Sequence, residues 1–519
     1  MLTTPLFYAN ASPHMGSAYP TMAADALARY HRLTGKTVRF VTGTDEHGEK
    51  IALSAEARGL TPTDHVDSIS AEFRALWSDL DIAFDAFVRT TDDKHARLVR
   101  SVIDKVRAKG DIYMARYSGH YCIDCEEYKA ESDMTEDGLC PIHLKPCVLK
   151  DEENYFFRLS KYQERIERLF EENPDFVQPE SRRNEVLGWV KKGLNDFSIS
   201  RGAVDWGIKF PEDPSQTVYV WFDALLGYVS AIQSAEEADV DGGAAAPEGW
   251  PADVHIIGKD ILRFHAVYWP AMLMSAELAL PRAVYGHGFL TKDGLKMGKS
   301  LGNVLDPKEL VGSYGSDAVR YFFLKEIPFG QDGDFKEDSF VDIVNAHLAN
   351  NIGNCLNRTS NLLKKNCAST LPLDAESIAQ ENPIRRVVEE SVPLVGPAFE
   401  ALDFGAACEA VLSISNRCNQ HMEEVAPWSL FKSESSTDRE KAEQVLVSIL
   451  EALRVVAIVL SPVTPELSQK IYAQLGCEGF DAVRWEDAHW GVLKEGHVVN
   501  KPKPVFQRLE IKATESVAT

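Results

Sequence analysis

The sequence predicts an α/β domain built on a parallel sheet, interrupted by a cysteine-bearing segment and followed by an all-α helix bundle. Three observations lead to this fold class. A strand, an amphipathic helix and a second strand follow one another within residues 2–42, and such a βαβ unit implies a parallel sheet. Cysteine and histidine residues with chelating spacing lie within residues 120–148. Beyond residue 334 the apolar residues recur with helical spacing.

The first βαβ unit puts polar residues where parallel sheets bind ligands. A buried strand is expected over residues 2–9, a turn over 10–17 and a helix over 18–33. The next strand, over residues 36–42, is closed by Gly43-Thr44-Asp45. Because ligands bind beyond the carboxyl ends of parallel strands, we expect His14 and Asp45 to lie at one edge of the sheet.

Between residues 63 and 286 the chain first leaves the predicted sheet and later returns to it with further strands. The apolar pattern predicts helices over residues 63–109, with a break near 81–85, and again over 155–208. Buried strands are expected over 217–222, 254–257 and 283–286, and a helix over 261–278. The acidic, Gly- and Ala-rich stretch 235–250 is typical of a surface insertion.

A zinc site is predicted in the cysteine-bearing segment. Cys122, Cys125, Cys140 and His143 form a C-x₂-C-x₁₄-C-x₂-H pattern, and two short chelating pairs separated by a small loop suit tetrahedral zinc. Four protein ligands leave no open position, so this site is expected to be structural. Cys147 lies close enough in the sequence to compete with His143, which leaves the fourth ligand open.

The Gly-rich stretch from Gly288 to Asn303 is interpreted as a mobile loop that closes over a polyphosphate. It carries Lys296 and Lys299, followed directly by Ser300. Glycines let a backbone approach a ligand closely, and the lysine ammonium is a compact charge suited to phosphate oxygens. Taken alone, the stretch is equally well explained as a Gly-rich turn with solvated lysines.

Composition narrows the class of protein. The chain has 519 residues, long enough for several domains, and a net charge of -23 that argues against general nucleic-acid coating. No apolar run reaches the roughly 18 residues of a membrane span, and no leader pattern is present. The nine cysteines do not form a secreted disulfide framework. A soluble intracellular protein with no membrane contact is expected.

Two separated motifs carry a resemblance to a known family. His14-Met15-Gly16-Ser17 after the first strand and Lys296-Met297-Gly298-Lys299-Ser300 after the last one resemble the "HIGH" and "KMSKS" signatures of class I aminoacyl-tRNA synthetases. The resemblance is strongest to the methionyl-tRNA synthetase family, in its bacterial and organellar type with a single zinc knuckle, and it covers essentially the whole chain. Residues 40–48, 219–224 and 257–265 support it. Ser17 and Gly298 depart from the signatures.

The resemblance implies a division into domains. It assigns the first half of a Rossmann-like catalytic domain to residues 1–110, a zinc-bearing connective insertion to 111–215 and the second half of the catalytic domain to 216–288. The signature loop and a stem-contact region would occupy residues 289–338. An α-helical anticodon-binding domain would follow over 339–490, with a tail over 491–519.

The implied activity is that of a methionine–tRNA ligase. Such an enzyme uses ATP and Mg²⁺ to convert L-methionine to methionyl-adenylate and pyrophosphate. It then transfers the methionine to the 3′-terminal adenosine of initiator and elongator tRNA(Met). In this reading the catalytic residues are His14, Lys296 and Lys299, and the ATP-binding residues are His14, Gly16, Ser17, Gly258, Asp260, Lys296, Lys299 and Ser300.

The same resemblance implies the remaining contacts. The methionine-binding residues would be Leu6, Tyr8, Asp45, Trp221, Ala224, Tyr228, Ile261, Phe264, His265 and Trp269. Asn354, Arg358 and Trp428 would read the anticodon, since single-stranded bases are recognised by aromatic stacking and by Arg or Asn on their edges. Zn²⁺ would be held by Cys122, Cys125, Cys140 and His143.

The sequence leaves two alternative functions to consider. The departures at Ser17 and Gly298 favour, as an alternative, a catalytically altered synthetase-like tRNA-binding protein. A small-molecule nucleotidyltransferase of the same superfamily would leave the helix bundle unexplained. We expect a monomer in a chloroplast, a mitochondrial matrix or a bacterial-type cytoplasm, with no transit peptide in this chain.

Overall fold

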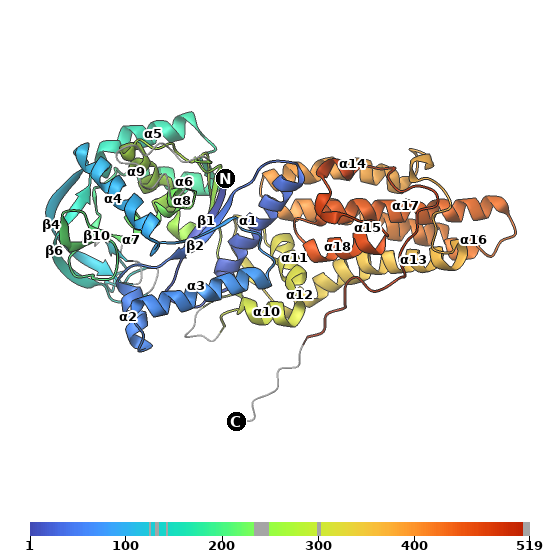
Figure 1. The fold of residues 1–519 in the computed structure, drawn as a ribbon, viewed down its shortest axis with the longest axis horizontal. Helices are drawn as coiled ribbons and strands as arrows, with labels where there is room; N and C mark the ends of the chain where they lie inside the picture. Colours follow the sequence, from blue (N-terminus) through green and yellow to red (C-terminus); the bar gives the residue numbers. More distant parts are fainter. Residues whose placement is uncertain (124–125, 130–133, 142–143, 233–248, 298–302, 512–519) are drawn as a thin grey trace, which may run out of the picture. The chain divides into compact units, whose positions relative to one another are not determined.

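The computed structural model describes residues 1–123, 126–129, 134–141, 144–232, 249–297 and 303–511. The chain divides into two compact units, which are described separately (Figure 1). The α/β unit comprises residues 1–24, 39–78 and 83–288, and the helical unit comprises residues 25–38, 79–82 and 289–519. Helix α1 (Met15–Leu33) contributes its first residues to the α/β unit and its later ones to the helical unit.

A six-stranded sheet forms the centre of the α/β unit. Every neighbouring pair in it is parallel. The order is β3 (Ala86–Arg89), β2 (Phe40–Asp45), β1 (Leu2–Tyr8), β12 (Val254–Gly258), β13 (Val284–His287), β7 (Val177–Gln178). From the β1–β12 pair the chain runs outward through β2 and β3 on one side, and through β12 and β13 on the other, where β7 forms the edge. This pair is therefore the switch point at which open α/β sheets bind ligands. The parallel sheet predicted from the sequence is confirmed.

Helices cover the sheet and supply the core. Apolar side chains of α4 and α9, such as Val99 and Leu273, are fully buried against it. The helical elements of this unit, besides α1, are α2 (Glu49–Ala57), α3 (Pro62–Asp79), α4 (Asp93–Ala108), η2 (Leu159–Tyr162), α5 (Gln163–Glu172), α6 (Glu180–Lys191), α7 (Val220–Ala224), α8 (Gly227–Ser230), η4 (Lys259–Ile261), the π-helical turn η5 (Phe264–Tyr268) and α9 (Trp269–Ala276).

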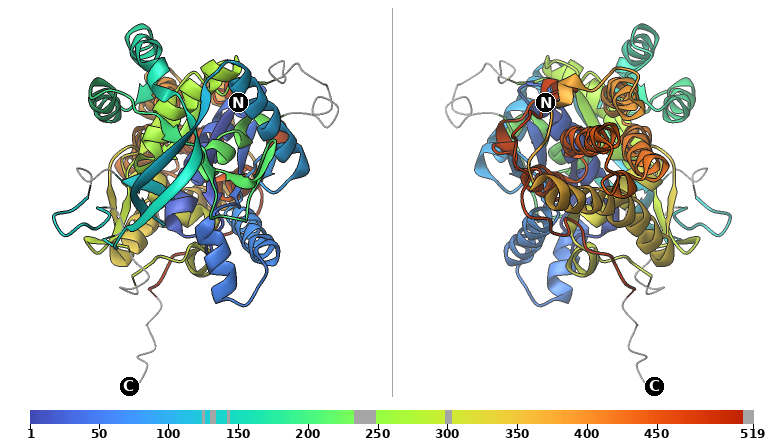
Figure 2. Two further views of the ribbon diagram at one scale, coloured as in Figure 1. Left: turned by 90° about the vertical axis from the view of Figure 1, so that its left-hand side faces the viewer. Right: turned by 90° about the vertical axis from the view of Figure 1, so that its right-hand side faces the viewer.

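The connective segment contains small antiparallel sheets as well as helices. One sheet has the order β5 (Glu127–Lys129), β4 (Ile112–Cys122), β6 (Val148–Phe157), β8 (Phe197–Ser198), and the other has β10 (Lys209–Phe210), β11 (Asp213–Val218), β9 (Ser200–Arg201). The helices predicted over 155–208 are confirmed by η2, α5 and α6, but strands β8 and β9 and the end of β6 also lie in that range. The long β4–β6 pair, in teal, crosses the left-hand view of Figure 2. The predicted strand over 217–222 is also wrong beyond Val218, because α7 begins at Val220. Short apolar runs do not distinguish strand from helix by periodicity.

The helical unit confirms the predicted bundle. Asn382 caps one of its long helices by accepting hydrogen bonds from the N–H groups of Ile384 and Arg385. Its helical elements are α10 (Pro307–Tyr314), α11 (Ser316–Glu326), α12 (Glu337–Val344), the π-helical η7 (Asn345–Gly353), α13 (Asn354–Cys367), η8 (Ala375–Ser377), α14 (Pro383–Glu400), α15 (Phe404–Val425), α16 (Pro427–Leu430), α17 (Ser436–Leu460), α18 (Pro465–Gln474), η9 (Phe480–Ala482) and η10 (Trp485–Asp487). A small sheet has the order β15 (Leu295–Lys296), β14 (Leu290–Lys292), β16 (Gly333–Phe335).

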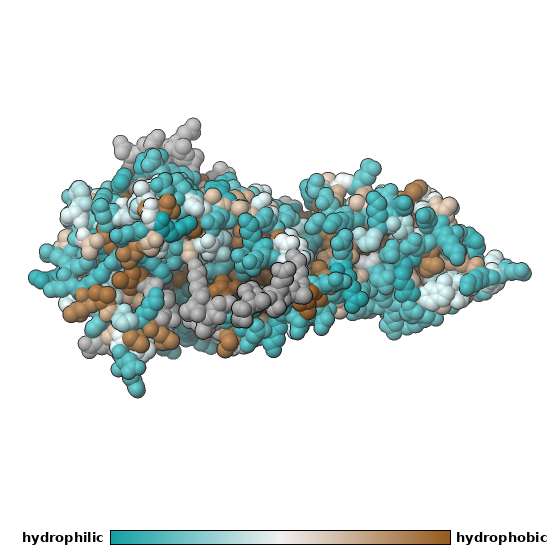
Figure 3. Space-filling view, turned by 90° about the horizontal axis from the view of Figure 1, so that it is seen from below, coloured by the Kyte–Doolittle hydropathy of each residue, from teal (hydrophilic) through white to brown (hydrophobic). Residues whose placement is uncertain are grey.

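Hydrophilic side chains cover most of the face drawn in Figure 3, with apolar residues exposed in small groups. Among the described residues, we find no helix that combines the length and the apolar character needed to cross a membrane.

A buried ion pair fixes the end of the bundle. Glu451 on α17 is fully buried and accepts hydrogen bonds from the backbone N–H groups of residues 491–493 at 3.0–3.1 Å. Its other partner is Arg454, at 2.8 Å, whose guanidinium also donates to the carbonyl of Asp487 at 2.7 Å. Glu451 therefore ties the segment after the bundle to its longest helix.

We expect Glu451→Ala to lower the free energy of unfolding of the helical unit by about 3–5 kcal/mol, since it leaves a buried guanidinium and buried N–H groups without their partner. Urea denaturation followed by circular dichroism measures the shift. Glu440→Ala, an exposed position on the same helix, is the matched control and should stay within about 0.5 kcal/mol of the wild type. Equal midpoints for the two variants would contradict the role given to Glu451.

Candidate active site

The turn after β1 closes on itself around His14. The hydroxyl of Ser17 donates to the carbonyl of His14 at 2.9 Å and accepts from the His14 N–H at 3.1 Å. The N–H of Gly16 donates to Nδ1 of His14 at 3.0 Å. A Cβ at Gly16 would lie 2.8 Å from Cε1 of His14, so a side chain there would force the imidazole ring to shift. His14 is exposed at the start of α1, where N–H groups and the helix dipole favour an anion.

The neighbouring strands end in residues that face the same edge of the sheet. Strand β12 ends at Gly258, and a Cβ there would lie only 2.4 Å from Oδ1 of Asp260. Strand β13 ends at His287, whose ring packs edge-on against Tyr19 of α1 with the centroids 5.8 Å apart. Five residues predicted from the sequence thus lie at or just after the carboxyl ends of β1 and β12: His14, Gly16, Ser17, Gly258 and Asp260.

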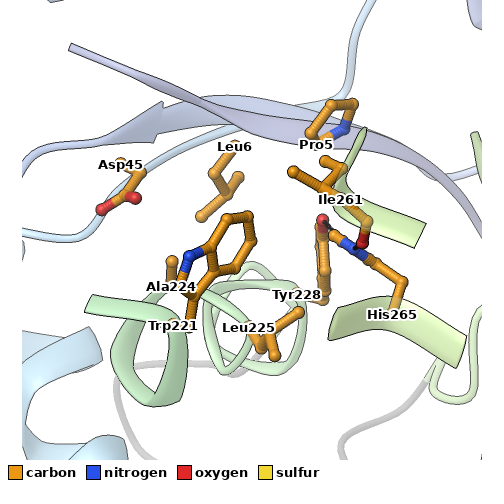
Figure 4. A pocket seen from close by; sticks show the side chains of 9 residues that line it. All are labelled: Pro5, Leu6, Asp45, Trp221, Ala224, Leu225, Tyr228, Ile261 and His265. Carbon is orange, nitrogen blue, oxygen red and sulfur yellow. Dashed lines mark hydrogen bonds between the residues drawn. The ribbon is translucent and has the colours of Figure 1, made fainter. Parts of the chain in front are cut away.

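A small pocket lies at the same switch point. The pocket is lined by Pro5, Leu6, Asp45, Trp221, Ala224, Leu225, Tyr228, Ile261 and His265. Figure 4 shows the side chains of Leu6, Trp221 and Tyr228 pointing toward one another, with Asp45 at one side. About 20 Å³ is open to a water-sized sphere, which is room for about one water molecule.

Most of the predicted methionine-binding residues line this pocket, but three do not. Phe264 stacks on Trp221 with ring centroids 3.9 Å apart, and Trp269 packs behind Tyr228 at 6.2 Å. Tyr8 instead donates a hydrogen bond from its hydroxyl to Glu126. Pro5 and Leu225 line the pocket and were missed; each lies next to a predicted residue, Leu6 or Ala224, and their proximity in sequence was the available signal.

The polar side chains of His265 and Tyr228, which form the floor of the pocket, are held in their neutral forms. Nδ1 of His265 lies 3.0 Å from the carbonyl of Ile261, so this nitrogen carries the proton and donates it. Nε2 then accepts from the hydroxyl of Tyr228 at 2.7 Å. Burial lowers the pKa of His265 to about 4 and raises the pKa of Tyr228. The floor therefore presents aromatic faces and one phenol oxygen, without charge.

A single carboxylate borders this neutral floor. Asp45 is 7% exposed, and its Oδ1 is buried without a hydrogen-bond partner. Burial, followed by the nearby charge of Asp223, raises the pKa of Asp45 well above its ordinary value. An unpartnered buried carboxylate is costly unless a cation or donor satisfies it. The site thus suits a ligand with an apolar part and a positively charged group.

Asp223 connects the loop after β2 to the helix that carries Trp221. Its two oxygens lie 2.6 Å from Nδ1 of His47 and 2.5 Å from Nε2 of His95. Burial alone would raise its pKa, but the two imidazoles outweigh this and lower the pKa of Asp223 to about 2. A charged, fully bonded Asp223 holds His47, and with it the Asp45 loop, against α7.

The described part of the predicted zinc site brings thiols near one another. Cys122 and Cys140 are buried, and burial together with these two neighbours raises the pKa of the Cys147 thiol. Cys125 and His143 lie outside the described residues. Within the residues that are described, no three potential ligands are arranged to hold a metal ion. The donor chemistry of the cysteines suits zinc.

The lysine loop belongs to the helical unit. Strand β15 ends at Lys296, and the loop before it is held by the N–H of Gly294, which donates to Asp334 at 2.8 Å. Gly298, Lys299 and Ser300 lie outside the described residues, as does the side chain of Lys296.

The three predicted anticodon residues gather on one part of the helical unit. The guanidinium of Arg358 on α13 lies 5.5 Å from the ring centroid of Trp428 on α16, and it pairs with Glu423 at 2.7 Å. Asn354 is exposed one turn before Arg358 on the same helix. An exposed amide, a guanidinium and a half-buried indole are groups that recognise unstacked bases.

Comparisons with known proteins agree with this arrangement. The family described as "tRNA synthetases class I (M)" matches residues 1–146 and 131–360, and the "Anticodon binding domain of methionyl tRNA ligase" matches residues 371–518. The chain is 57% identical to the chloroplastic/mitochondrial methionine–tRNA ligase of Arabidopsis thaliana, over 98% of this chain and 83% of that protein. It is 50% identical to the methionine–tRNA ligase of Synechocystis sp., over 99% and 98%.

A solved structure is similar along the whole chain. The Mycobacterium tuberculosis methionyl-tRNA synthetase in complex with methionyl-adenylate has a TM-score of 0.92 at 40% identity, covering 98% of this chain and 99% of that one. These matches, together with the switch-point pocket and the helix bundle, show that the chain belongs to the methionyl-tRNA synthetase family of class I tRNA synthetases.

Proposed function

We propose that this chain is a methionine–tRNA ligase that makes methionyl-adenylate from L-methionine and ATP and passes the methionine to tRNA(Met). The observation that carries the proposal is the neutral aromatic pocket bordered by the buried, unpartnered Asp45 carboxylate at the sheet's switch point. Methionine has the matching chemistry, because its side chain is apolar, unbranched and polarisable and its ammonium group is a cation.

In the proposed complex Asp45 binds the ammonium group, and Leu6, Trp221, Ala224, Tyr228, Ile261 and His265 surround the side chain. The thioether would lie among ring edges, where sulfur packs favourably. Because the pocket has room for only about one water molecule, its lining side chains must move apart for methionine to enter. Phe264 and Trp269 support Trp221 and Tyr228 from behind, and such a pocket discriminates by about 1–3 kcal/mol per methylene.

The reaction itself needs little covalent work from the protein. A carboxylate oxygen of methionine attacks the α-phosphorus of ATP, the bond from that phosphorus to the bridging oxygen breaks, and pyrophosphate leaves. A ribose hydroxyl of the terminal adenosine then attacks the carbonyl carbon, and AMP leaves with the bonding electrons. Catalysis of such steps comes from positioning and from stabilising charge on phosphate oxygens.

His14, Gly16, Ser17, Gly258 and Asp260 are the proposed contacts of the nucleotide on the α/β unit, and Lys296, Lys299 and Ser300 those on the signature loop. The hydroxyl of Ser17 bonds both backbone polar groups of His14, so the serine closes the turn that presents the imidazole. This observation supports a working catalytic turn over the alternative of a catalytically altered tRNA-binding protein.

Two metal ions are part of the proposal. Mg²⁺ would accompany ATP and neutralise its phosphate oxygens. A structural Zn²⁺ would be held by Cys122, Cys125, Cys140 and His143, with Cys147 as the competing fourth ligand. This zinc would be structural: it would hold the cysteine-bearing segment together by binding its side chains, and it would supply no other chemistry.

We also propose a function for each segment of the chain and a compartment for the protein. We assign residues 1–110 and 216–288 to the catalytic domain, 111–215 to the connective insertion, 289–338 to the signature loop and stem contact, and 339–490 to anticodon binding. The similarity to a chloroplastic/mitochondrial enzyme and to a cyanobacterial one supports a chloroplast, a mitochondrial matrix or a bacterial-type cytoplasm.

Aminoacylation of tRNA tests the proposal and the anticodon contacts together. We expect the wild type to charge initiator and elongator tRNA(Met) with methionine. Trp428→Ala and Arg358→Ala should each raise the KM for tRNA about tenfold to a hundredfold, since one stacked base contributes about 1–3 kcal/mol. Methionine-dependent pyrophosphate exchange, which does not use the anticodon, should be unchanged in both variants.

Arg386→Ala is the matched control, because Arg386 is exposed on α14 of the same unit and its loss removes the same charge. It should charge tRNA like the wild type. If Arg386→Ala loses as much tRNA affinity as Arg358→Ala, general electrostatics and not base recognition explains the effect of Arg358. If the wild type charges no tRNA, the ligase assignment fails.

A further inference from the structure

Glu126, in the turn between β4 and β5 of the connective segment, is buried and bonds to residues of the parallel-sheet core. It is 5% exposed, and its backbone adopts a left-handed conformation with φ 52°. Oε1 accepts from the hydroxyl of Tyr8 at 2.9 Å and from the backbone N–H of Lys50 at 2.9 Å. Oε2 accepts from the hydroxyl of Tyr121 at 2.6 Å. One carboxylate therefore joins β1, the start of α2 and β4.

The backbone around this carboxylate is shaped to admit it. A Cβ at Gly48, which has φ 118°, would lie 2.7 Å from the Tyr8 hydroxyl and 2.8 Å from Oε1 of Glu126. Only glycine leaves room for the two oxygens to approach this segment. Oε1 also lies at the N-terminus of α2, where the helix dipole favours a negative charge. The position therefore suits a side-chain oxygen that accepts hydrogen bonds.

Tyr8 transmits the position of Glu126 to the pocket. Tyr8 pairs directly with Asp45 across the β1–β2 ladder, and it follows the pocket residue Leu6 by two positions on β1. Burial raises the pKa of Tyr8 most, and the charges of Glu126 and then Asp45 add to this rise, so Tyr8 and Asp45 are electrostatic neighbours. A carboxylate can only accept, so the Tyr8 hydroxyl donates its proton to Glu126, and the phenol oxygen keeps lone pairs that can accept a hydrogen bond.

We propose that Glu126 is a positioning residue for amino-acid binding: it fixes Tyr8 beside Asp45 and so makes the connective segment part of the methionine site. The inference rests on the proposed function. It assigns to the turn that directly follows the second predicted zinc cysteine a task beyond holding that segment together.

A double-mutant cycle in methionine-dependent ATP–pyrophosphate exchange tests this. Glu126→Ala and Tyr8→Phe should each raise the KM for methionine on the order of tenfold, as expected for loss of a buried hydrogen bond to a charged group. The KM for ATP should change less than about twofold. Because both variants break one contact, the double variant should be about as impaired as either single one, whereas independent sites would give additive losses.

Two further variants complete the design. Glu126→Gln keeps an oxygen that accepts from Tyr8, so it should restore the KM for methionine to within about threefold of the wild type. Glu127→Ala is the neighbouring control, because its carboxylate pairs with Lys129 and not with Tyr8, and it should behave as the wild type. Tyr8→Phe keeps the ring and therefore tests the contact even if Glu126→Ala does not fold.

The possible outcomes distinguish a failure of the positioning role of Glu126 from a failure of the proposed function. If the wild type and Glu127→Ala show no methionine-dependent exchange, the proposed function itself fails. If they exchange normally but Tyr8→Phe keeps the wild-type KM for methionine, or the cycle is additive, or both KM values rise equally, the positioning role of Glu126 is overturned.

Discussion

Replacing Asp45 with asparagine is expected to lower kcat/KM for methionine about a hundredfold or more, because truncating a buried charge partner of a ligand costs about 2–5 kcal/mol. Asparagine keeps the size of the side chain but offers no negative charge to the ammonium group. The unpartnered Oδ1 in this structure is the atom that the ligand would satisfy. Pyrophosphate exchange at varied methionine and saturating ATP measures the effect, which should fall on KM for methionine more than on KM for ATP.

The same carboxylate predicts a pH dependence. Burial, followed by Asp223, raises the pKa of Asp45 in the free protein, so its ionised fraction grows as pH rises through that pKa. Only the ionised form attracts an ammonium group. Methionine affinity should therefore increase with pH up to a plateau above the pKa of Asp45, and binding should release a proton where the group is still partly protonated.

Glu164→Gln, an exposed position on α5, removes one negative charge elsewhere in the α/β unit and serves as the control. It should keep both the wild-type kcat/KM and the wild-type pH profile. An Asp45→Asn variant with wild-type methionine kinetics, or with an unchanged pH profile, would show that the carboxylate does not bind the amino acid.

Replacing His14 with alanine is expected to lower kcat for pyrophosphate exchange about a hundredfold to a thousandfold, the usual loss when one preorganised donor to a developing oxyanion is removed. The Gly16 N–H donates to Nδ1 of His14, so a neutral imidazole carries its proton on Nε2. That N–H is a donor for a phosphate oxygen at the start of α1, where the helix dipole adds to the stabilisation.

Lys299→Ala should have a comparable effect on kcat, since its ammonium group is the proposed counter-charge to the same phosphates. His14→Gln, which keeps an N–H donor at a similar reach, should recover part of the rate. Thermal unfolding checks that the variants stay folded, and the His14 variants should match the wild type because His14 is exposed. Exchange at the wild-type rate in both alanine variants would show that neither His14 nor Lys299 contributes to the reaction.

The elements with a clear period were predictable, and those set by distant contacts were not. The strands around Leu6 and Ile257 and the long bundle helices followed from apolar periodicity alone. The β4–β6 pair was missed because its strands alternate irregularly and pair across the cysteine segment. Trp221 lies on a helix although its neighbours favour a strand, since tertiary packing overrides local propensity for β-branched and aromatic residues.

The site shows the same division. The motifs around His14 and Asp45 could be placed at the sheet edge because a βαβ unit fixes where strands end. The resemblance supplied most of the pocket. The partners of Asp223, His47 and His95, could not be found from the sequence, because they are brought together only by folding. The same is true of Glu126, which has no periodicity or motif to mark it.

Pyrophosphate exchange, measured with each of the standard amino acids in turn, with ATP and the full chain, tests whether the pocket is specific for methionine. We expect rapid exchange with methionine, and weak or no exchange with the others, because only an unbranched, polarisable side chain with an α-ammonium group satisfies both the aromatic pocket and Asp45. Exchange that is absent with methionine, or faster with another amino acid, would contradict this specificity.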